Sequence, residues 1–353
     1  MKKLLSLSCI ALLGAALSLS CNKLPETAQV ASDSGDMATL RISLSGIDTD
    51  INVRASTTEE HSGDKTATDI QILIYDSAGN FIQALDEQGL VSLSKGMVYT
   101  VVAIINGPNN VGEHLSLVSA NRIDLSSHPY AMTGMTTADL RTASSLEIEL
   151  NVSSIASRIH LKSIKNNLPP AFGNLVLKKV FLCNVMDGMT VFGNESDTWQ
   201  NNYGRKALNT LITPNSLEGS VDSTVPTAAT THKAFDDQVI ASEATFNANS
   251  WFYTFPSSHR ESVPSNLASS TVWTPQSTWI TVCGTIGGTV YYWTSNLGSK
   301  LQNGLERNKS YDIAIVLNNL GTGDPATLTT PGHAEFTVAV TPWQAGSEIN
   351  ETI

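Results

Sequence analysis

The sequence predicts an all-β protein made of two β-sandwich domains with few short helices. Apolar and polar residues alternate with period two along many segments, and this period sends successive side chains to opposite faces of a sheet. Helical periodicity is scarce, and 24 glycines accompany many Ser, Thr and Asn residues, as is typical of strands joined by turns. A chain of 353 residues with 41% hydrophobic content is large enough for two domains with sizeable cores.

The N-terminal half contains four segments with strand character. In the first, Leu40, Ile42 and Leu44 alternate with polar residues, which predicts one buried and one exposed face. The third is a nearly continuous β-branched and aromatic run, which suits a strand buried on both faces. The four predicted strands are 39–45, 70–75, 97–105 and 146–152.

The C-terminal half repeats these signals, and a domain boundary is expected near 153–158. Residues 38–155 would then form the N-terminal sandwich and residues 156–353 the C-terminal one. Helical structure is limited to a short segment at 207–212 and a turn at 139–143. The predicted strands are centred on 159–161, 175–182, 251–255, 279–283, 290–293, 311–317 and 336–340.

The amino terminus has the form of an export signal. Two lysines precede an apolar stretch that ends at Ser20-Cys21, so residues 1–20 are predicted to be a lipoprotein signal peptide. Cys21 would carry the lipid, and the alternative is ordinary signal cleavage nearby without modification of Cys21. Residues 21–37 are mostly polar and small, and predict a tether. No other stretch is long enough to span a membrane, so attachment would be through lipid alone.

Composition and motifs exclude several function classes. A net charge of -11 disfavours a nucleic-acid partner, because neutralising phosphates requires clustered Lys and Arg. None of the seven histidines stands in a metalloprotease motif, and no nucleophile elbow or nucleotide-binding loop is present. The sequence therefore predicts no enzyme, no catalytic residue and no cofactor.

Two further patterns are candidates for binding sites. Asp48, Asp50, Asn52 and Glu59 match acidic positions of a calcium loop, but Val53 stands where the turn needs glycine, so no metal site is expected. Aromatic residues could line a sugar site, but at this strand spacing they are more typical of a core. These residues are Trp251, Phe252, Tyr253 and Trp279.

Two cysteines, Cys183 and Cys283, lie in the predicted C-terminal domain. They could pair in an oxidising compartment or remain buried and reduced. The sequence leaves both states open.

A polar segment follows the first predicted strand and contains Arg54 ahead of Ala55. An arginine among small polar residues in an exposed loop suits cleavage by an Arg-specific protease. By itself this signal is weak, because any surface arginine would qualify.

The order of several motifs resembles the fimbrillin family, the major subunits of type V pili of Gram-negative anaerobes. The resemblance includes the lipobox, the Val53-Arg54-Ala55 step and a Gly-rich turn at 321–325, and it is loose between 165 and 300. It also includes the block Leu305-Glu306-Arg307-Asn308-Lys309-Ser310-Tyr311-Asp312-Ile313 and the strand 335–343, which ends in Trp343.

The resemblance implies a cell-surface adhesion fimbrium built from transthyretin-like sandwiches. The precursor would be an outer-membrane lipoprotein, and an Arg-specific protease would cut between Arg54 and Ala55. That cut would release residues 38–54 with their strand. Another subunit would fill the emptied groove with its own C-terminal strand. The implied partners are copies of this chain and other pilus subunits, and the implied donor residues are Phe336, Val338 and Val340.

Elementary physics is compatible with this assembly. A lost strand leaves an apolar groove and unpaired backbone groups that can pair with another chain. A contact between opposite ends of identical subunits that does not close produces a filament. In the alternative interpretation of 335–341, this segment is an ordinary terminal strand that stays in its own domain.

Two other functions are alternatives to a pilus shaft. One is a monomeric or tip-located surface lipoprotein that binds glycan or another host ligand. The other is a hydrolase, for which the sequence offers no site. Arg54 argues against a membrane-anchor subunit, because an anchor would keep its lipid and cleavage after Arg54 would remove it.

Overall fold

The structure is a computed structural model of the chain. It describes residues 36–47, 67–109, 112, 114–125, 127–183, 185–186, 189–193, 202–203, 232–257, 278–297, 301, 304–323 and 328–342. Most of these residues lie in strands and very few lie in helices, so the all-β prediction is confirmed. Among them, no helix is both long enough and apolar enough to cross a bilayer.

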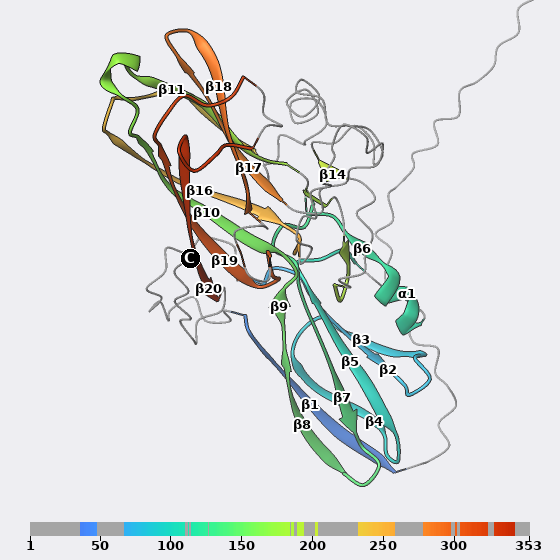
Figure 1. Ribbon diagram of the computed structural model, residues 1–353. Coiled ribbons are helices and arrows are strands. Elements are labelled where there is room, and N and C mark those ends of the chain that lie inside the picture. Colours follow the sequence, from blue (N-terminus) through green and yellow to red (C-terminus); the bar gives the residue numbers. More distant parts are fainter. Residues whose placement is uncertain are drawn as a thin grey trace, which may run out of the picture. The chain divides into compact units, whose positions relative to one another are not determined.

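The first group of strands forms two facing sheets (Figure 1). One sheet has three strands in the order β4-β1-β8, and the other has five in the order β3-β2-β5-β7-β9. All four strands predicted in this half are present. The elements are β1 Met37–Ser45, β2 Ile70–Tyr75, β3 Phe81–Leu85, β4 Gly89–Ser94, β5 Val98–Ile105, α1 Leu115–Ala120, β6 Arg122–Ile123, β7 Met132–Asp139, β8 Ser145–Asn151 and β9 Ser153–Ser154.

Strand β5 is buried on both faces, as its continuous apolar sequence predicts. Val101 and Ala103 belong to the cluster between the two sheets, together with residues of β1 and β4. Val102 and Ile104 point the other way, into a second cluster beneath α1. Both faces of this strand therefore contribute to packing, which explains why its sequence does not alternate.

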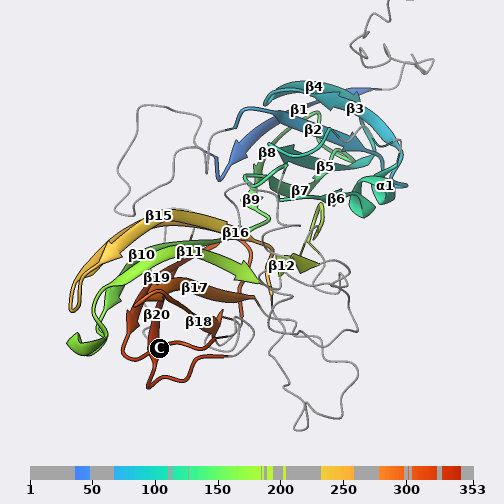
Figure 2. The same ribbon diagram turned by 90° about the horizontal axis from the view of Figure 1, so that it is seen from above.

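The second group of strands forms two four-stranded sheets, in the orders β16-β10-β19-β20 and β15-β11-β17-β18 (Figure 2). Their inward faces share one large apolar cluster. All seven segments predicted in this half lie in strands. The elements are β10 Ser157–Asn166, η1 Pro170–Phe172, β11 Leu175–Cys183, β12 Val185–Met186, β13 Met189–Thr190, β14 Asn202–Tyr203, β15 His232–Ile240, β16 Thr245–Thr254, β17 Trp279–Ile286, β18 Thr289–Asn296, β19 Lys309–Leu317 and β20 Ala334–Pro342.

Sheet membership changes between Ser154 in β9 and Ser157 in β10, within the expected boundary region. The two groups of strands are not isolated, because β13 pairs with β6 through Met189 opposite Ile123. The residues from Met37 onward form a single compact unit. The division into two domains, residues 38–155 and 156–353, remains a prediction.

The helical segments differ from those expected. Asp139 is the last residue of β7, and residues 140–143 belong to the non-helical connection to β8. Residues 207–212 lie outside the described part of the chain. The six-residue helix α1 was not predicted. It begins after His114, whose Nδ1 accepts the backbone N–H of Ser116 at 3.2 Å.

Candidate functional site

Strand β1 lies in the middle of its sheet, between β4 and β8 (Figure 1). It pairs antiparallel with β4 over residues 37–42 and parallel with β8 over residues 39–45. In the described chain, neither β4 nor β8 forms a ladder with any other strand. Strand β1 is therefore the element that joins this sheet together.

The inward face of β1 is deeply buried. Ala38, Leu40 and Ile42 are at most 2% exposed, and Leu44 is partly buried against the same cluster. Burying a leucine or isoleucine side chain contributes about 1.5–3 kcal/mol. The face of β1 that is predicted to be removed is therefore part of the core between the two sheets. Its removal stays a prediction.

Taking β1 away would expose both hydrogen-bonding edges and apolar surface at once. Among the described strands, β4 and β8 would each lose the one ladder that they form. Val91, Leu93 and Leu150, which lie in the same cluster as β1, would lose packing partners. Unpaired backbone groups beside an apolar slot are a strong template for another strand.

Strand β20 is the last strand of its sheet in the described chain, and it pairs antiparallel with β19 alone (Figure 2). Its inward face is formed by Ala334, Phe336 and Val338, which are buried, and by Val340, which is partly buried. The predicted donor residues therefore pack in the core of their own group of strands. A donor role requires β20 to leave this position, and it stays a prediction.

The other predicted processing residues are Cys21, Arg54 and Ala55, and all three lie outside the described residues.

The Arg307 side chain, from the block that carried the family resemblance, forms a joint between the two groups of strands. Its Nη1 donates to Phe192 O at 3.0 Å, and its Nη2 donates to Thr133 Oγ1 at 3.3 Å. The same guanidinium donates to Ser153 O and Oγ and to Ser154 O, at 3.3 to 3.4 Å. Burial lowers the pKa of Arg307. The joint thus links the segment before β19 to β7, β9 and residue 192.

Neighbouring residues hold Arg307 in place. Asn308 has a positive φ of 57°, a conformation that asparagine tolerates, and its N–H donates to Ala156 O at 2.9 Å. Glu306 N donates to the Tyr311 hydroxyl oxygen at 2.6 Å, and Ser157 Oγ donates to Glu306 O at 2.7 Å. Sequence reasoning singled out this block but assigned it no physical role.

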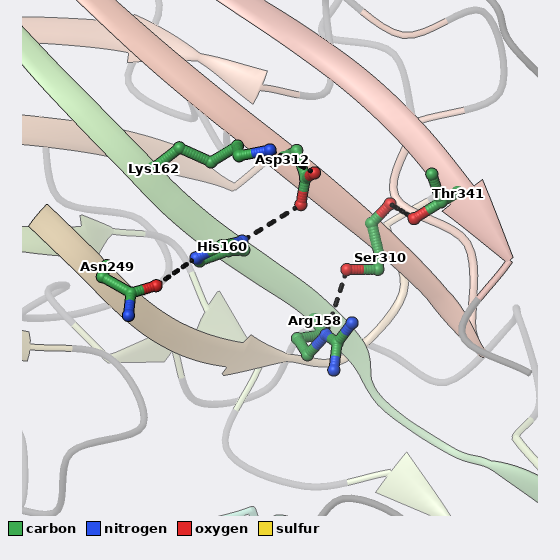
Figure 3. Close-up of polar contacts among 7 residues, drawn as sticks. All are labelled: Arg158, His160, Lys162, Asn249, Ser310, Asp312 and Thr341. Atoms are coloured by element: carbon green, nitrogen blue, oxygen red, sulfur yellow. Dashed lines mark hydrogen bonds and ion pairs between the residues drawn. The ribbon is translucent and has the colours of Figure 1, made fainter. Parts of the chain in front are cut away.

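A polar cluster crosses the face of the β16-β10-β19-β20 sheet that is opposite its core (Figure 3). His160 lies between Asn249 and Asp312, with Nε2 2.9 Å from Asn249 Oδ1 and Nδ1 3.2 Å from Asp312 Oδ1. Trp251 stacks on the His160 ring with centroids 4.5 Å apart. Lys162 Nζ lies 3.4 Å from Asp312 Oδ2.

The same cluster extends to β20. Arg158 Nε donates to Ser310 Oγ at 3.0 Å, and Thr341 Oγ1 donates to Ser310 O at 3.5 Å (Figure 3). These contacts connect neighbouring strands side by side. The cluster therefore stabilises the sheet and presents no nucleophile paired with a base.

The neighbours of Asp312 in this cluster shift the pKa of its carboxyl group. Burial by itself would raise the pKa of Asp312. The hydrogen bond from His160 and the nearby Lys162 charge outweigh burial, so the pKa lies below its ordinary value. The carboxylate form is therefore favoured in the folded chain.

The described aromatic residues do not form an exposed platform. Phe252, Tyr253 and Trp279 are buried, as the core interpretation expects, and Trp251 is partly covered by His160. Within the described ranges, no group of three His, Cys, Asp or Glu side chains is placed to hold a metal ion.

The strand register fixes the spacing between Cys183 and Cys283 along the β11–β17 ladder. Cys183 in β11 lies opposite Trp279, whereas Cys283 in β17 lies opposite Lys179. This offset of four positions along the ladder separates the two Cα atoms by about 13 Å. A disulfide requires Cα atoms closer than about 7 Å, so this backbone spacing is longer than a disulfide between these two positions would span.

Solved structures share this arrangement. A candidate cell adhesion protein from Bacteroides eggerthii DSM 20697 aligns with a TM-score of 0.59 and 16% identity, covering 88% of this chain and 97% of that chain. A fimbrilin from Porphyromonas gingivalis W83 aligns with a TM-score of 0.58 and 14% identity, covering 88% and 98%. A candidate cell adhesion protein from Parabacteroides distasonis ATCC 8503 aligns with a TM-score of 0.55 and 14% identity, covering 88% and 100%.

No protein-family model matches the sequence, and no curated protein matches it. The structural similarity extends over most of the chain in each case, at low sequence identity. The chain therefore has the fold of the fimbrilin and of these candidate adhesion proteins.

Proposed function

We propose that this chain is a structural subunit of a cell-surface fimbrium, most consistent with the shaft, and that it supports adhesion. The observation that carries the proposal is the position of β1. It lies next to the amino-terminal tether, it is the central strand of its sheet, and a predicted cleavage site at Arg54 follows it. The shared fold with a fimbrilin supports the same function.

In this proposal the precursor is exported as a lipoprotein modified at Cys21. An Arg-specific protease cuts between Arg54 and Ala55, which severs β1 from the rest of the chain. A neighbouring subunit then supplies its C-terminal strand region, represented by Phe336, Val338 and Val340. Repetition of this head-to-tail contact produces the filament.

Cleavage alone does not empty the groove. Strand β1 is held by two backbone ladders and by the burial of Ala38, Leu40 and Ile42. The nicked precursor therefore keeps its β1 peptide until another strand displaces it. This behaviour separates a shaft subunit from a monomeric lipoprotein, whose β1 would remain covalently attached.

The test uses precursor lacking residues 1–20, treated with trypsin. We expect a new amino terminus at Ala55, a β1 peptide that is retained in native mass spectra, and oligomers that appear as the peptide is lost. Arg54→Gln should abolish all three effects. The matched control is Arg141→Gln. Arg141 is a well exposed arginine in a turn, and its side chain forms an ion pair with Asp139.

Two outcomes would contradict the proposal. The first is a trimmed product that loses its β1 peptide and remains monomeric. The second is assembly by the Arg54→Gln variant at the rate of the parent protein. The first result would favour the monomeric or tip-located surface lipoprotein, and the second would exclude Arg54 as the processing site.

A further inference from the structure

Strand β18 is the last strand of its sheet, but a connecting segment lies along its outer edge. The order β15-β11-β17-β18 leaves one side of β18 without a strand ladder in the described ranges. The connection between β19 and β20 contacts that side, and it is described over residues 319–323 and 328–330. We call these residues the strap. They include the start of the Gly-rich turn at 321–325, to which the sequence assigned no physical role.

The strap forms hydrogen bonds with the backbone of two alternate residues of β18. Tyr292 N donates to Thr322 O, and Thr322 N donates to Tyr292 O, each at 2.8 Å. Thr329 N donates to Thr294 O, and Thr294 N donates to Thr329 Oγ1, again at 2.8 Å. Alternate residues of a strand direct their backbone groups to the same side. The strap therefore uses the groups that a further strand of this sheet would need.

The strap also packs closely against β18. Trp293 Nε1 donates to Asn319 O at 2.9 Å. A Cβ atom on Gly321 would overlap Tyr292 O and lie 3.0 Å from Trp293 Cδ2, so this close approach requires glycine. Two residues later, a Cβ atom on Gly323 would meet open space. The first of these two glycines is therefore specific to the contact with β18.

The sequence of β18 explains why its edge needs a cover. The strand Thr289–Asn296 contains a valine and three consecutive aromatic residues, and none of its residues is charged. An uncharged edge strand rich in β-branched and aromatic residues is a template for pairing with another chain. Sheets protect such edges with charges, with a kinked backbone or with a covering segment.

The opposite edge of the same sheet, β15, is protected in a different way. Asp236 and Asp237 are consecutive residues with positive φ values of 44° and 62°, so the backbone leaves the extended conformation there. The register of the β15–β11 ladder shifts in the same region. Lys178 Nζ lies 2.6 Å from Asp237 Oδ1, which adds charge to this edge. One edge of the sheet is thus kinked and charged, and the other is covered by the strap.

We propose that the strap keeps the β18 edge from self-association, and that displacing the strap lets β18 pair antiparallel with β18 of a second copy. The partner is a second copy because each molecule would expose the same uncharged edge. A strand paired with its own copy forms a closed two-fold contact, which joins two four-stranded sheets into one. The inference goes beyond the proposed function and depends on neither β1 nor cleavage at Arg54.

The test uses two strap variants and one matched control, each in uncleaved chain lacking residues 1–20. Gly321→Val places a branched side chain against Tyr292 O and forces the strap away from β18. Thr329→Val keeps the shape of the side chain and removes the hydroxyl group that accepts Thr294 N. Gly323→Ala is the control, because it changes a glycine of the same turn that has open space around it.

Hydrogen exchange and native mass spectrometry measure the outcome. In dilute protein, the amides of Tyr292 and Thr294 should exchange about five- to tenfold faster in Gly321→Val, the factor expected for one lost hydrogen bond. In concentrated protein, Gly321→Val should form dimers, and the two amides should regain protection. Thr329→Val should produce the same changes to a smaller extent. Gly323→Ala should match the parent protein.

A further substitution identifies the contact as the edge of β18. Val290 lies in β18 and its side chain is 43% exposed, so Val290→Lys is compatible with the fold. A lysine on an edge strand opposes pairing with another chain. Added to Gly321→Val, this substitution should abolish the dimer and leave the faster exchange in place.

Three results would overturn the inference. Faster exchange without dimers in both strap variants would exclude self-association through β18. Dimers that persist with Val290→Lys, or that form equally in Gly323→Ala, would exclude this edge as the contact. Unchanged exchange of Tyr292 and Thr294 in both strap variants would exclude the strap as the cover. Parent-like exchange across β10 and β19 verifies that each variant is folded.

Discussion

The two sheets that contain β1 and β20 respond differently to the loss of one strand. Without β1, the β4-β1-β8 sheet is reduced to two separate strands. Without β20, the other sheet keeps three paired strands, β16, β10 and β19. The comparison teaches that the position of a strand in its sheet, more than its apolar pattern, determines what its removal does.

The largest difference should come from truncating the buried face of each strand. Leu40→Ala in β1 should cost about 2–5 kcal/mol, because it leaves a cavity between two sheets. Val338→Ala in β20 should cost about 2 kcal/mol, because it removes two carbon atoms beside an edge. Urea unfolding with hydrogen exchange measures both effects.

The exchange pattern is the sharper readout. Leu40→Ala should accelerate exchange of β4 and β8 together and leave β10 and β19 unchanged. Val338→Ala should affect β19 alone among the neighbouring strands. Equal effects of both variants across all of these strands would show that the sheets unfold as one cooperative unit.

The next effect concerns the joint between the two groups of strands. Arg307→Met should lower the free energy of unfolding by about 2–3 kcal/mol, because several buried acceptors lose a charged donor. Arg307→Lys should recover only part of this loss, since an ammonium group cannot reproduce the planar fork. Calorimetry should show the transition broaden as the two groups unfold separately, and an unchanged single transition would contradict the joint.

A smaller effect concerns pH and the polar cluster beside β20. The pKa of Asp312 is lowered in the folded chain, so its contribution is complete above the unfolded value of about 3.9. The contribution is lost as the pH falls below that value, through the lower folded pKa. Asp312→Asn should remove this acid dependence and cost about 1 kcal/mol or less at neutral pH.

The free energy of unfolding, measured by urea titration from pH 6 to pH 2.5, tests this prediction. Asp86→Asn, in the turn between β3 and β4, serves as the matched control. If Asp312→Asn keeps the parent acid slope, the cluster does not carry the dependence.

The smallest effect should come from the surface of β1. Arg41 Nε lies 3.1 Å from Glu147 Oε1, but both side chains are more than half exposed. Arg41→Ala should therefore change stability by less than about 0.5 kcal/mol and leave retention of the nicked β1 peptide unaltered. Faster release of that peptide would show that the ion pair, rather than the ladders, retains β1.

Local sequence patterns predicted the strands well but did not determine their neighbours. The alternation of Leu40, Ile42 and Leu44 identified β1, and the continuous run in β5 identified burial on both faces. Nothing local shows that β1 pairs in parallel with β8, which lies about a hundred residues later. Pairing between distant strands depends on the whole fold. The sequence therefore could not predict which strands lie inside a sheet and which lie at its edge.

Similar physical reasons explain why the sequence did not predict other features. The helix α1 has only six residues and a histidine cap, so it lacks both length and a common capping signal. The role of Arg307 depends on carbonyl and hydroxyl groups that are far away in the sequence. The spacing of Cys183 and Cys283 depends on the β11–β17 register, which shifts between Leu177 and Lys179.

The acceptors of Arg307 have a consequence for the conditions under which the joint holds. Every acceptor recorded for its guanidinium among the described residues is an uncharged oxygen. Such oxygens do not gain or lose protons in ordinary media, and dissolved ions screen buried contacts only weakly. The attachment between the two halves of the molecule should therefore withstand acidic and saline surroundings alike.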